Sequence, residues 1–184
     1  VFSVDWQMFE GINLAIDIGE MKKEDVPFIP DVVWASPDCT TYTIAAISTH
    51  RNGTEPKSDY AKKCDQVNRH FIELINEWEK INPNMVYFIE NPRGMLRKMP
   101  FMQNLKRHTI WYCQYGDDRA KPTDIWTNSQ TWKPRNICHN RNKNCHHQPA
   151  PRGSKTGTQG RKGSYERSKI PRELCLEVLS SACR

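Results

Sequence analysis

The sequence contains no long hydrophobic run. No apolar stretch approaches the roughly 18 residues that a transmembrane helix needs, and the mean hydropathy is −0.78. The first residues show no positively charged and apolar pattern typical of a secretory signal peptide. These absences exclude the membrane-spanning classes of protein.

The sequence also lacks a disulfide framework. Its seven cysteines are an odd number, they are widely spread, and 184 residues suffice to build one sizeable core without disulfides. We therefore expect reduced thiols and an intracellular, cytoplasmic protein.

Acidic residues are scarce between Lys133 and Arg172, where lysine and arginine are frequent, whereas residues 1–31 lean acidic. The net charge is +6, and such a basic segment favours a polyanion as partner. A solvated basic loop explains the same charge equally well. Aliphatic side chains are almost missing from residues 128–168, so we expect this region to order on binding or around a metal ion.

The remaining chain shows the periodicities of an α/β protein. Apolar residues recur at helical spacing over residues 59–81, with Ser58 as the expected N-cap. This helix lies between two strand-like runs, Val32–Ala35 and Val86–Ile89, so the three segments predict a βαβ crossover with parallel strands. Residues 109–113 and 123–127 predict an antiparallel hairpin at the sheet edge.

One cysteine and one glutamate follow these two parallel strands. Cys39 lies in the turn Ser-Pro-Asp-Cys-Thr-Thr at residues 36–41, and Glu90 begins the sequence Glu-Asn-Pro. Because the carboxyl ends of parallel strands meet at one sheet edge, a thiol and a carboxyl group are expected there together. This pairing suggests covalent catalysis with proton transfer, although an isolated turn cysteine is more often a small core residue.

These two motifs resemble those of the DNA (cytosine-5) methyltransferases. Weaker similarities to other motifs of the family lie at residues 4–6, 17–18, 115–121 and 167–171, so the resemblance covers most of the chain. The chain is similar in kind to the short family members of phages and prophages, of the restriction-modification type. The resemblance implies a class I (Rossmann-like) methyltransferase sandwich, with a mostly parallel sheet and an antiparallel edge hairpin. Together with the change in composition, this predicts a catalytic core (1–132), a basic loop region (133–168) and a C-terminal helix region that returns to the core (169–184).

The resemblance also implies S-adenosylmethionine-dependent methylation of cytosine at ring carbon 5 in DNA. In that chemistry a thiolate adds to ring carbon 6 while a carboxyl group protonates ring nitrogen 3. The catalytic residues implied are Cys39, Glu90 and Arg119. Asn91 and Lys121 are implied at the flipped nucleotide. The residues implied for the cofactor are Asp5, Trp6, Asp17, Ile18 and Pro37.

The chain departs from the family pattern at three places. Asp38 replaces the usual proline before the cysteine, Asp118 replaces an expected glutamine, and the glycine-rich first motif is not among these residues. Two alternatives therefore stay open. One is a catalytically inactive relative that binds nucleic acid, and the other is an RNA cytosine methyltransferase.

The basic region contains two further candidate sites. Cys138, His139, Cys145 and His147 offer zinc ligands, although their spacing matches no standard zinc finger and contact with phosphate is the plainer interpretation. Arg152, Lys155 and Arg161 are candidates for contacts with the DNA backbone.

Overall fold

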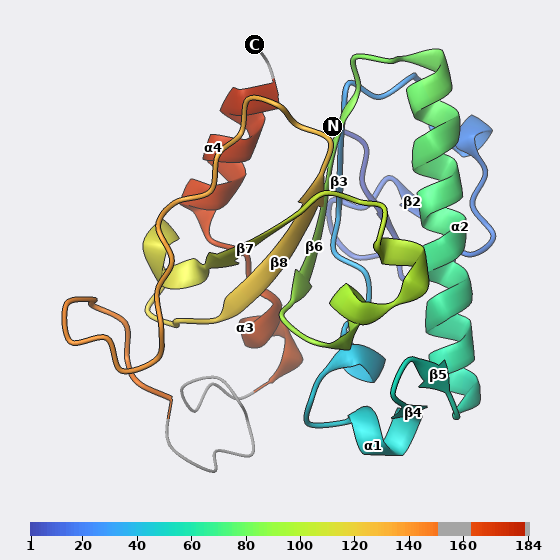
Figure 1. Ribbon diagram of the computed structural model, residues 1–184. Helices are drawn as coiled ribbons and strands as arrows, with labels where there is room; N and C mark the ends of the chain where they lie inside the picture. The colour runs from blue at the N-terminus through green and yellow to red at the C-terminus, as the bar shows by residue number, and fades with distance from the viewer. Residues whose placement is uncertain (151–162, 183–184) are drawn as a thin grey trace.

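The computed structural model describes residues 1–150 and 163–182, which form a small α/β fold (Figure 1). The strands are β1 (Val4–Asp5), β2 (Leu14–Ala15), β3 (Val32–Ala35), β4 (Arg51–Asn52), β5 (Glu55–Pro56), β6 (Val86–Pro92), β7 (Arg107–Trp111) and β8 (Pro122–Thr127). The helices in this part are α1 (Ile47–His50), α2 (Asp59–Ile81), α3 (Ser164–Ser168) and α4 (Arg172–Ala182). Short 3-10 turns are η1 (Lys23–Asp25), η2 (Thr40–Tyr42), η3 (Met95–Lys98), η4 (Pro100–Met102) and η5 (Tyr112–Tyr115).

The central sheet has the strand order β3-β6-β8-β7. Strands β3 and β6 are parallel, with Val32 opposite Val86 and Ala35 opposite Ile89. Strand β8 is antiparallel to both of its neighbours. The predicted βαβ crossover and the antiparallel hairpin are therefore confirmed, and the hairpin places β7 at the sheet edge.

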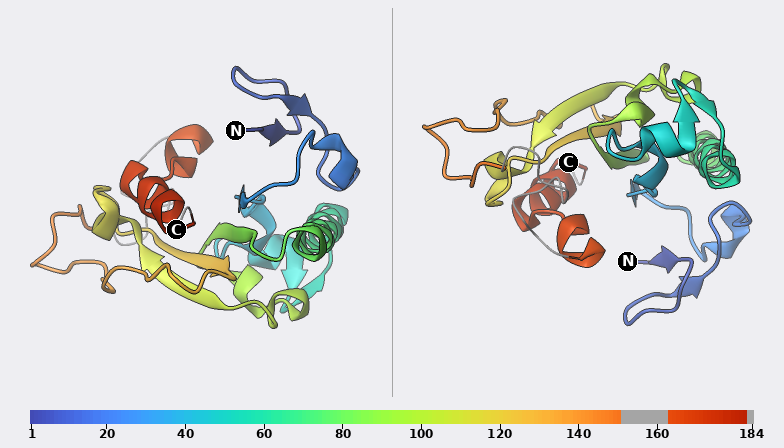
Figure 2. Two further views of the ribbon diagram at one scale, coloured as in Figure 1. Left: turned by 90° about the horizontal axis from the view of Figure 1, so that it is seen from above. Right: turned by 90° about the horizontal axis from the view of Figure 1, so that it is seen from below.

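The prediction of a Rossmann-like sandwich with a mostly parallel sheet was wrong. The sheet is mixed, since only one of its three strand pairs is parallel. The short connection between β7 and β8 forces an antiparallel pair, and β8 then inserts between β7 and β6. Strands β1 and β2 form a separate two-stranded parallel sheet, which lies apart from the central sheet in Figure 2.

Helix α2 forms over the predicted residues. The Ser58 hydroxyl accepts a hydrogen bond from the Ala61 backbone N–H at 3.1 Å, as an N-cap does. The buried face of α2 includes Phe71, Leu74 and Trp78. The apolar pattern predicted a buried face along the whole helix, but Tyr60 at its start and Ile81 at its end are exposed.

Two apolar clusters cover opposite faces of the central sheet. Tyr87 and Ile89 of β6 pack with α2, whereas Phe88 packs with α4. This alternation follows from the two-residue period of a strand. Figure 1 shows the sheet nearly edge-on between α2 and α4. In the described part of the chain, the structure contains no helix with the length and apolarity of a membrane span.

Candidate functional site

The turn after β3 presents Cys39 in a half-buried position. The residue immediately precedes η2, and the Cys39 carbonyl accepts a hydrogen bond from the Tyr42 N–H at 3.0 Å. Its neighbour Asp38 turns its carboxylate to the Thr40 N–H, at 2.6 Å, and to the Tyr60 hydroxyl. These contacts fix the conformation of the turn and aim the Asp38 side chain toward α2.

Glu90 lies inside β6 and is only 5% exposed. The Tyr112 hydroxyl donates a hydrogen bond to Glu90 Oε1 at 2.7 Å. The ammonium group of Lys121 lies 4.0 Å from the same oxygen and 4.4 Å from the centre of the Tyr112 ring. The carboxyl group therefore sits in a largely dry setting with one neutral donor and one cation beside it.

Cys39, Glu90 and Lys121 influence one another electrostatically. Burial raises the pKa of the Cys39 thiol, and the charges of Asp38 and Glu90 raise it further, whereas Lys121 lowers it. Burial lowers the pKa of Lys121, against the effect of Glu90. The structure thus brings these three residues together at the carboxyl ends of β3 and β6.

Asn91 links the two loops at this edge. Its Nδ2 donates a hydrogen bond to the Pro37 carbonyl at 2.9 Å, which joins β6 to the cysteine turn. Its Oδ1 is buried and has no hydrogen-bond partner among the described residues. A buried acceptor of this kind is costly unless something else occupies it. The sequence assigned Asn91 to the nucleotide and Pro37 to the cofactor, and in the structure the two residues contact each other.

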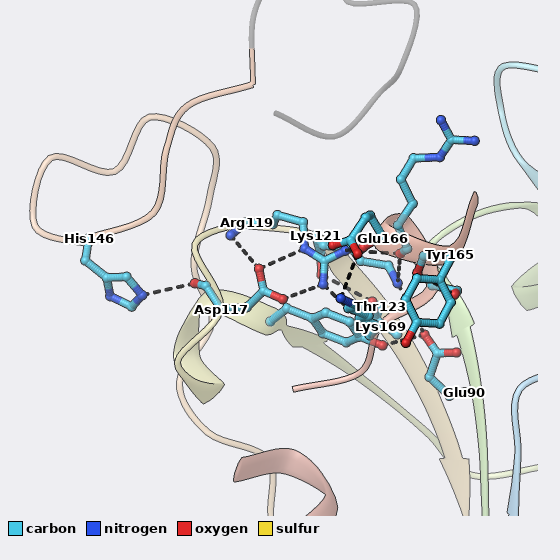
Figure 3. Close-up of polar contacts among 12 residues, drawn as sticks. Glu90, Asp117, Arg119, Lys121, Thr123, His146, Tyr165, Glu166 and Lys169 are labelled. Atoms are coloured by element: carbon cyan, nitrogen blue, oxygen red, sulfur yellow. Dashed lines mark hydrogen bonds and ion pairs between the residues drawn. The ribbon is translucent and has the colours of Figure 1, made fainter. Parts of the chain in front are cut away.

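Arg119 is completely buried and is not directed at Glu90 (Figure 3). Its guanidinium pairs with the Asp117 carboxylate and donates hydrogen bonds to the backbone carbonyls of Glu166, Arg167 and Lys169. Lys121 Nζ also donates to the Arg167 carbonyl, at 3.1 Å. Arg119 therefore fastens α3 and the residues after it to the start of β8, beside the site.

The residues assigned to the cofactor lie at the small sheet and in the turn that follows it. Asp5 ends β1, and the next residue, Trp6, is 72% exposed. Asp17 accepts hydrogen bonds from the Gly19 N–H at 2.8 Å and pairs with Lys63 of α2 at 2.9 Å. Ile18 packs against the α2 core. Trp6 is exposed and Ile18 is packed, whereas Asp5 and Asp17 are both half-buried hydrogen-bond acceptors, Asp5 Oδ1 accepting from the Gln7 N–H at 3.1 Å.

A second constellation gathers at the turn after β7. Cys113, Cys138, Cys145 and His147 place one potential ligand atom each within 4.8 Å of one another, so this cluster could hold a metal ion such as zinc. The sequence predicted three of these residues and missed Cys113. His139, the fourth residue predicted, is exposed and its Nδ1 lies 3.1 Å from the Asn140 carbonyl.

Two functional contacts were missed by the sequence analysis. Tyr112 and Cys113 occupy the first two positions of η5, directly after β7, and face Glu90 and the cysteine cluster respectively. The sequence analysis placed both residues at the end of a predicted strand over 109–113, whereas the strand ends at Trp111 and the turn that follows directs their side chains to these two sites. The candidate DNA contacts Arg152, Lys155 and Arg161 lie outside the described residues.

No family model matches the chain, and no curated protein or solved structure is significantly similar to it. The interpretation of both constellations therefore depends on their geometry and chemistry.

Proposed function

We propose that this protein methylates cytosine at ring carbon 5 in DNA through a covalent adduct with Cys39. One observation carries the proposal. A half-buried thiol and a buried carboxyl group lie together at the carboxyl ends of adjacent parallel strands. Addition of a thiolate to a pyrimidine ring, with protonation of a ring nitrogen, uses a nucleophile and an acid placed in this way.

The residues have separate roles in this chemistry. Cys39 Sγ forms a bond to ring carbon 6, while the Glu90 carboxyl group donates a proton to ring nitrogen 3, which makes carbon 5 nucleophilic. Bound S-adenosylmethionine supplies the methyl group that carbon 5 takes up. Loss of the hydrogen on carbon 5 as a proton to water, return of the nitrogen 3 proton to the Glu90 carboxylate, and cleavage of the carbon–sulfur bond would then release the methylated base and the Cys39 thiolate.

Lys121 supports the thiolate in this scheme. Its charge lowers the pKa of Cys39 and opposes the effects of burial and of Asp38. The Tyr112 hydroxyl holds the Glu90 carboxyl group in place through its 2.7 Å hydrogen bond. The unpaired Oδ1 of Asn91 offers an acceptor to the exocyclic amino group of a flipped cytosine.

The residues at the small sheet fit the adenosine part of the cofactor in part. The Asp5 carboxylate suits ribose hydroxyl groups, and the exposed Trp6 ring offers a stacking surface. Gly19 and Lys63 engage both carboxylate oxygens of Asp17, whereas the Gln7 N–H engages Oδ1 of Asp5, so we assign only Asp5 and Trp6 to cofactor binding.

Trapping with 5-fluorocytosine tests the proposal, because fluorine on carbon 5 prevents the final release. The full chain is incubated with S-adenosylmethionine and a duplex containing 5-fluorocytosine, and a denaturation-resistant complex is expected on gels. Cys39→Ala abolishes this complex. Cys175→Ala, which changes a half-buried cysteine on α4, retains it. If wild-type protein forms no complex, or Cys39→Ala still does, the proposal is wrong.

Burial and two nearby carboxylates raise the pKa of the Cys39 thiol, which favours a second candidate function, that of an inactive relative which binds nucleic acid. This function predicts salt-sensitive DNA binding with no binding of S-adenosylmethionine and no adduct. The same trapping assay with 5-fluorocytosine in RNA separates both candidates from an RNA methyltransferase.

A further inference from the structure

Three thiols and one imidazole converge between η5 and residues 138–147. Their ligand atoms all lie within 4.8 Å of one another, although Cys113 and Cys138 are 25 positions apart in the chain. Around a tetrahedral zinc ion with Zn–S bonds of about 2.3 Å, neighbouring sulfur atoms lie about 3.8 Å apart. The four side chains are thus within about 1 Å of the spacing that zinc requires.

The cluster is buried in a region that has little else to bury. Cys113, Cys138 and His147 are at most 5% exposed, while Ile137, an aliphatic side chain of this region, is 78% exposed. His147 Nδ1 lies 3.8 Å from Cys138 Sγ, and its Nε2 is buried with no hydrogen-bond partner in the described part of the chain. Ala120 and Trp111 pack against the cysteines, but apolar packing leaves the buried imidazole nitrogen unpaired, whereas binding of a metal ion accounts for the convergence of thiols and imidazole.

Side-chain amides surround the sulfur atoms. Gln114 Nε2 lies 3.8 Å from the sulfur atoms of both Cys113 and Cys145, and Asn142 Nδ2 lies 3.4 Å from that of Cys138. N–H donors in these positions stabilise the negative charge of thiolate ligands. The donor set of three sulfurs and one nitrogen is one that zinc prefers.

We propose that Cys113, Cys138, Cys145 and His147 bind one zinc ion, which fastens residues 138–148 to the segment that carries Arg119 and Lys121. The role is structural, because four protein ligands leave no open position for a substrate.

The loop that the ion orders contacts this segment directly. His146 Nε2 lies 3.0 Å from the Asp117 carbonyl, and the Gln148 N–H donates to the Asp118 carbonyl at 2.8 Å. Gln148 also forms a parallel bridge with Arg119. Figure 3 shows the line of contacts from His146 through Asp117 to Arg119. Zinc binding therefore supports the backbone that places Lys121 beside Glu90.

Metal analysis of the purified full chain tests the site. Protein purified from zinc-supplemented cells is expected to carry about one zinc ion per chain, as measured by inductively coupled plasma mass spectrometry. Cys113→Ser and His147→Ala lose the ion. His139→Ala and Cys175→Ser retain it, because neither residue belongs to the cluster. Retention by Cys113→Ser together with loss in His139→Ala would assign the ligands differently and overturn the proposal.

Cobalt substitution keeps the test independent of whether a variant folds. Wild-type protein reconstituted with Co²⁺ is expected to show thiolate-to-cobalt charge transfer and the visible bands of a tetrahedral ion. Removing the metal with a chelator is expected to speed hydrogen exchange at the Gln148 amide. Protein that carries no zinc, gives no cobalt spectrum and contains a disulfide within the cluster would overturn the proposal. Since none of these measurements involves methyl transfer, failure of the zinc site is distinguishable from failure of the proposed function.

Discussion

Opposing charges act on the sulfur of Cys39. Asp38 and Glu90 raise the pKa of the thiol on top of the effect of burial, and Lys121 lowers it. Asp38 turns away from the sulfur toward Thr40 and Tyr60, so its influence is one of charge and not of contact. The reactivity of Cys39 therefore depends on three charged neighbours, of which Asp38 and Lys121 can be changed without altering the proposed acid Glu90.

We predict that Asp38→Asn makes Cys39 more reactive and that Lys121→Met makes it less reactive. Removing the negative charge lowers the pKa of the thiol, so more thiolate is present at a given pH, and removing the positive charge has the opposite effect. The measurement is the rate of Cys39 alkylation by iodoacetamide between about pH 6 and pH 10, a range that spans thiol ionisation, followed by peptide mass spectrometry.

The midpoint of this pH profile is expected to move to lower pH in Asp38→Asn and to higher pH in Lys121→Met. Asparagine keeps an oxygen acceptor for the Thr40 N–H, so the turn itself is preserved. Asp31→Asn, an exposed change at the other end of β3, serves as the control. A shift of both midpoints in the same direction would contradict the electrostatic explanation.

A buried ion pair ties three elements together behind the cysteine turn. Arg51 of β4 donates two hydrogen bonds to the carboxylate of Asp65 on α2, at 2.6 and 3.1 Å. Arg51 Nε also donates to the carbonyl of Thr41 in η2, at 2.9 Å, and the Tyr42 hydroxyl donates to Asp65 at 2.7 Å. The turn that presents Cys39 is thus anchored to α2 through charged groups.

We predict that Asp65→Ala destabilises the protein by about 3 to 5 kcal/mol, because it leaves the Arg51 charge buried and unpaired. The measurement is the free energy of unfolding in urea. Glu73→Gln, which changes an exposed residue of the same helix, is the control and leaves the transition midpoint in place. A variant as stable as the wild type would show that water replaces the carboxylate at this position.

Elements were more predictable from the sequence than the contacts between them. Helix α2 and the strands around it carry local periodicity, and the order of strand, helix and strand fixes the parallel pair that brings Cys39 and Glu90 to one edge. The separation of β1 and β2 from the central sheet has no such local signal. The same holds for Cys113, whose place in the cysteine cluster depends on how residues 133–150 return to η5.

Positive charge is distributed unevenly over the whole molecule. Residues 133–150 extend from the sheet beside η5, in orange in Figure 2. Arg135 in this segment is paired with Glu173 and Glu177 of α4, so its charge is largely compensated. Arg141 and Lys143 are exposed, and no ion pair involves them within the part of the chain that the structure describes. These two side chains are therefore available to phosphate groups.

We predict that the double variant Arg141→Gln and Lys143→Gln binds duplex DNA with a weaker dependence on salt. Removal of one phosphate contact reduces the slope of log affinity against log salt by about 0.9, so the slope falls by about 2 if both side chains bind phosphate. Fluorescence anisotropy with a labelled duplex at several salt concentrations measures this slope. Lys80→Gln is the matched control, because Lys80 is exposed near the end of α2, at the edge of the sheet opposite Cys39 and Glu90. A double variant with the slope of the wild type would place the nucleic acid on another surface, and binding that is insensitive to salt would exclude a phosphate-based interface altogether.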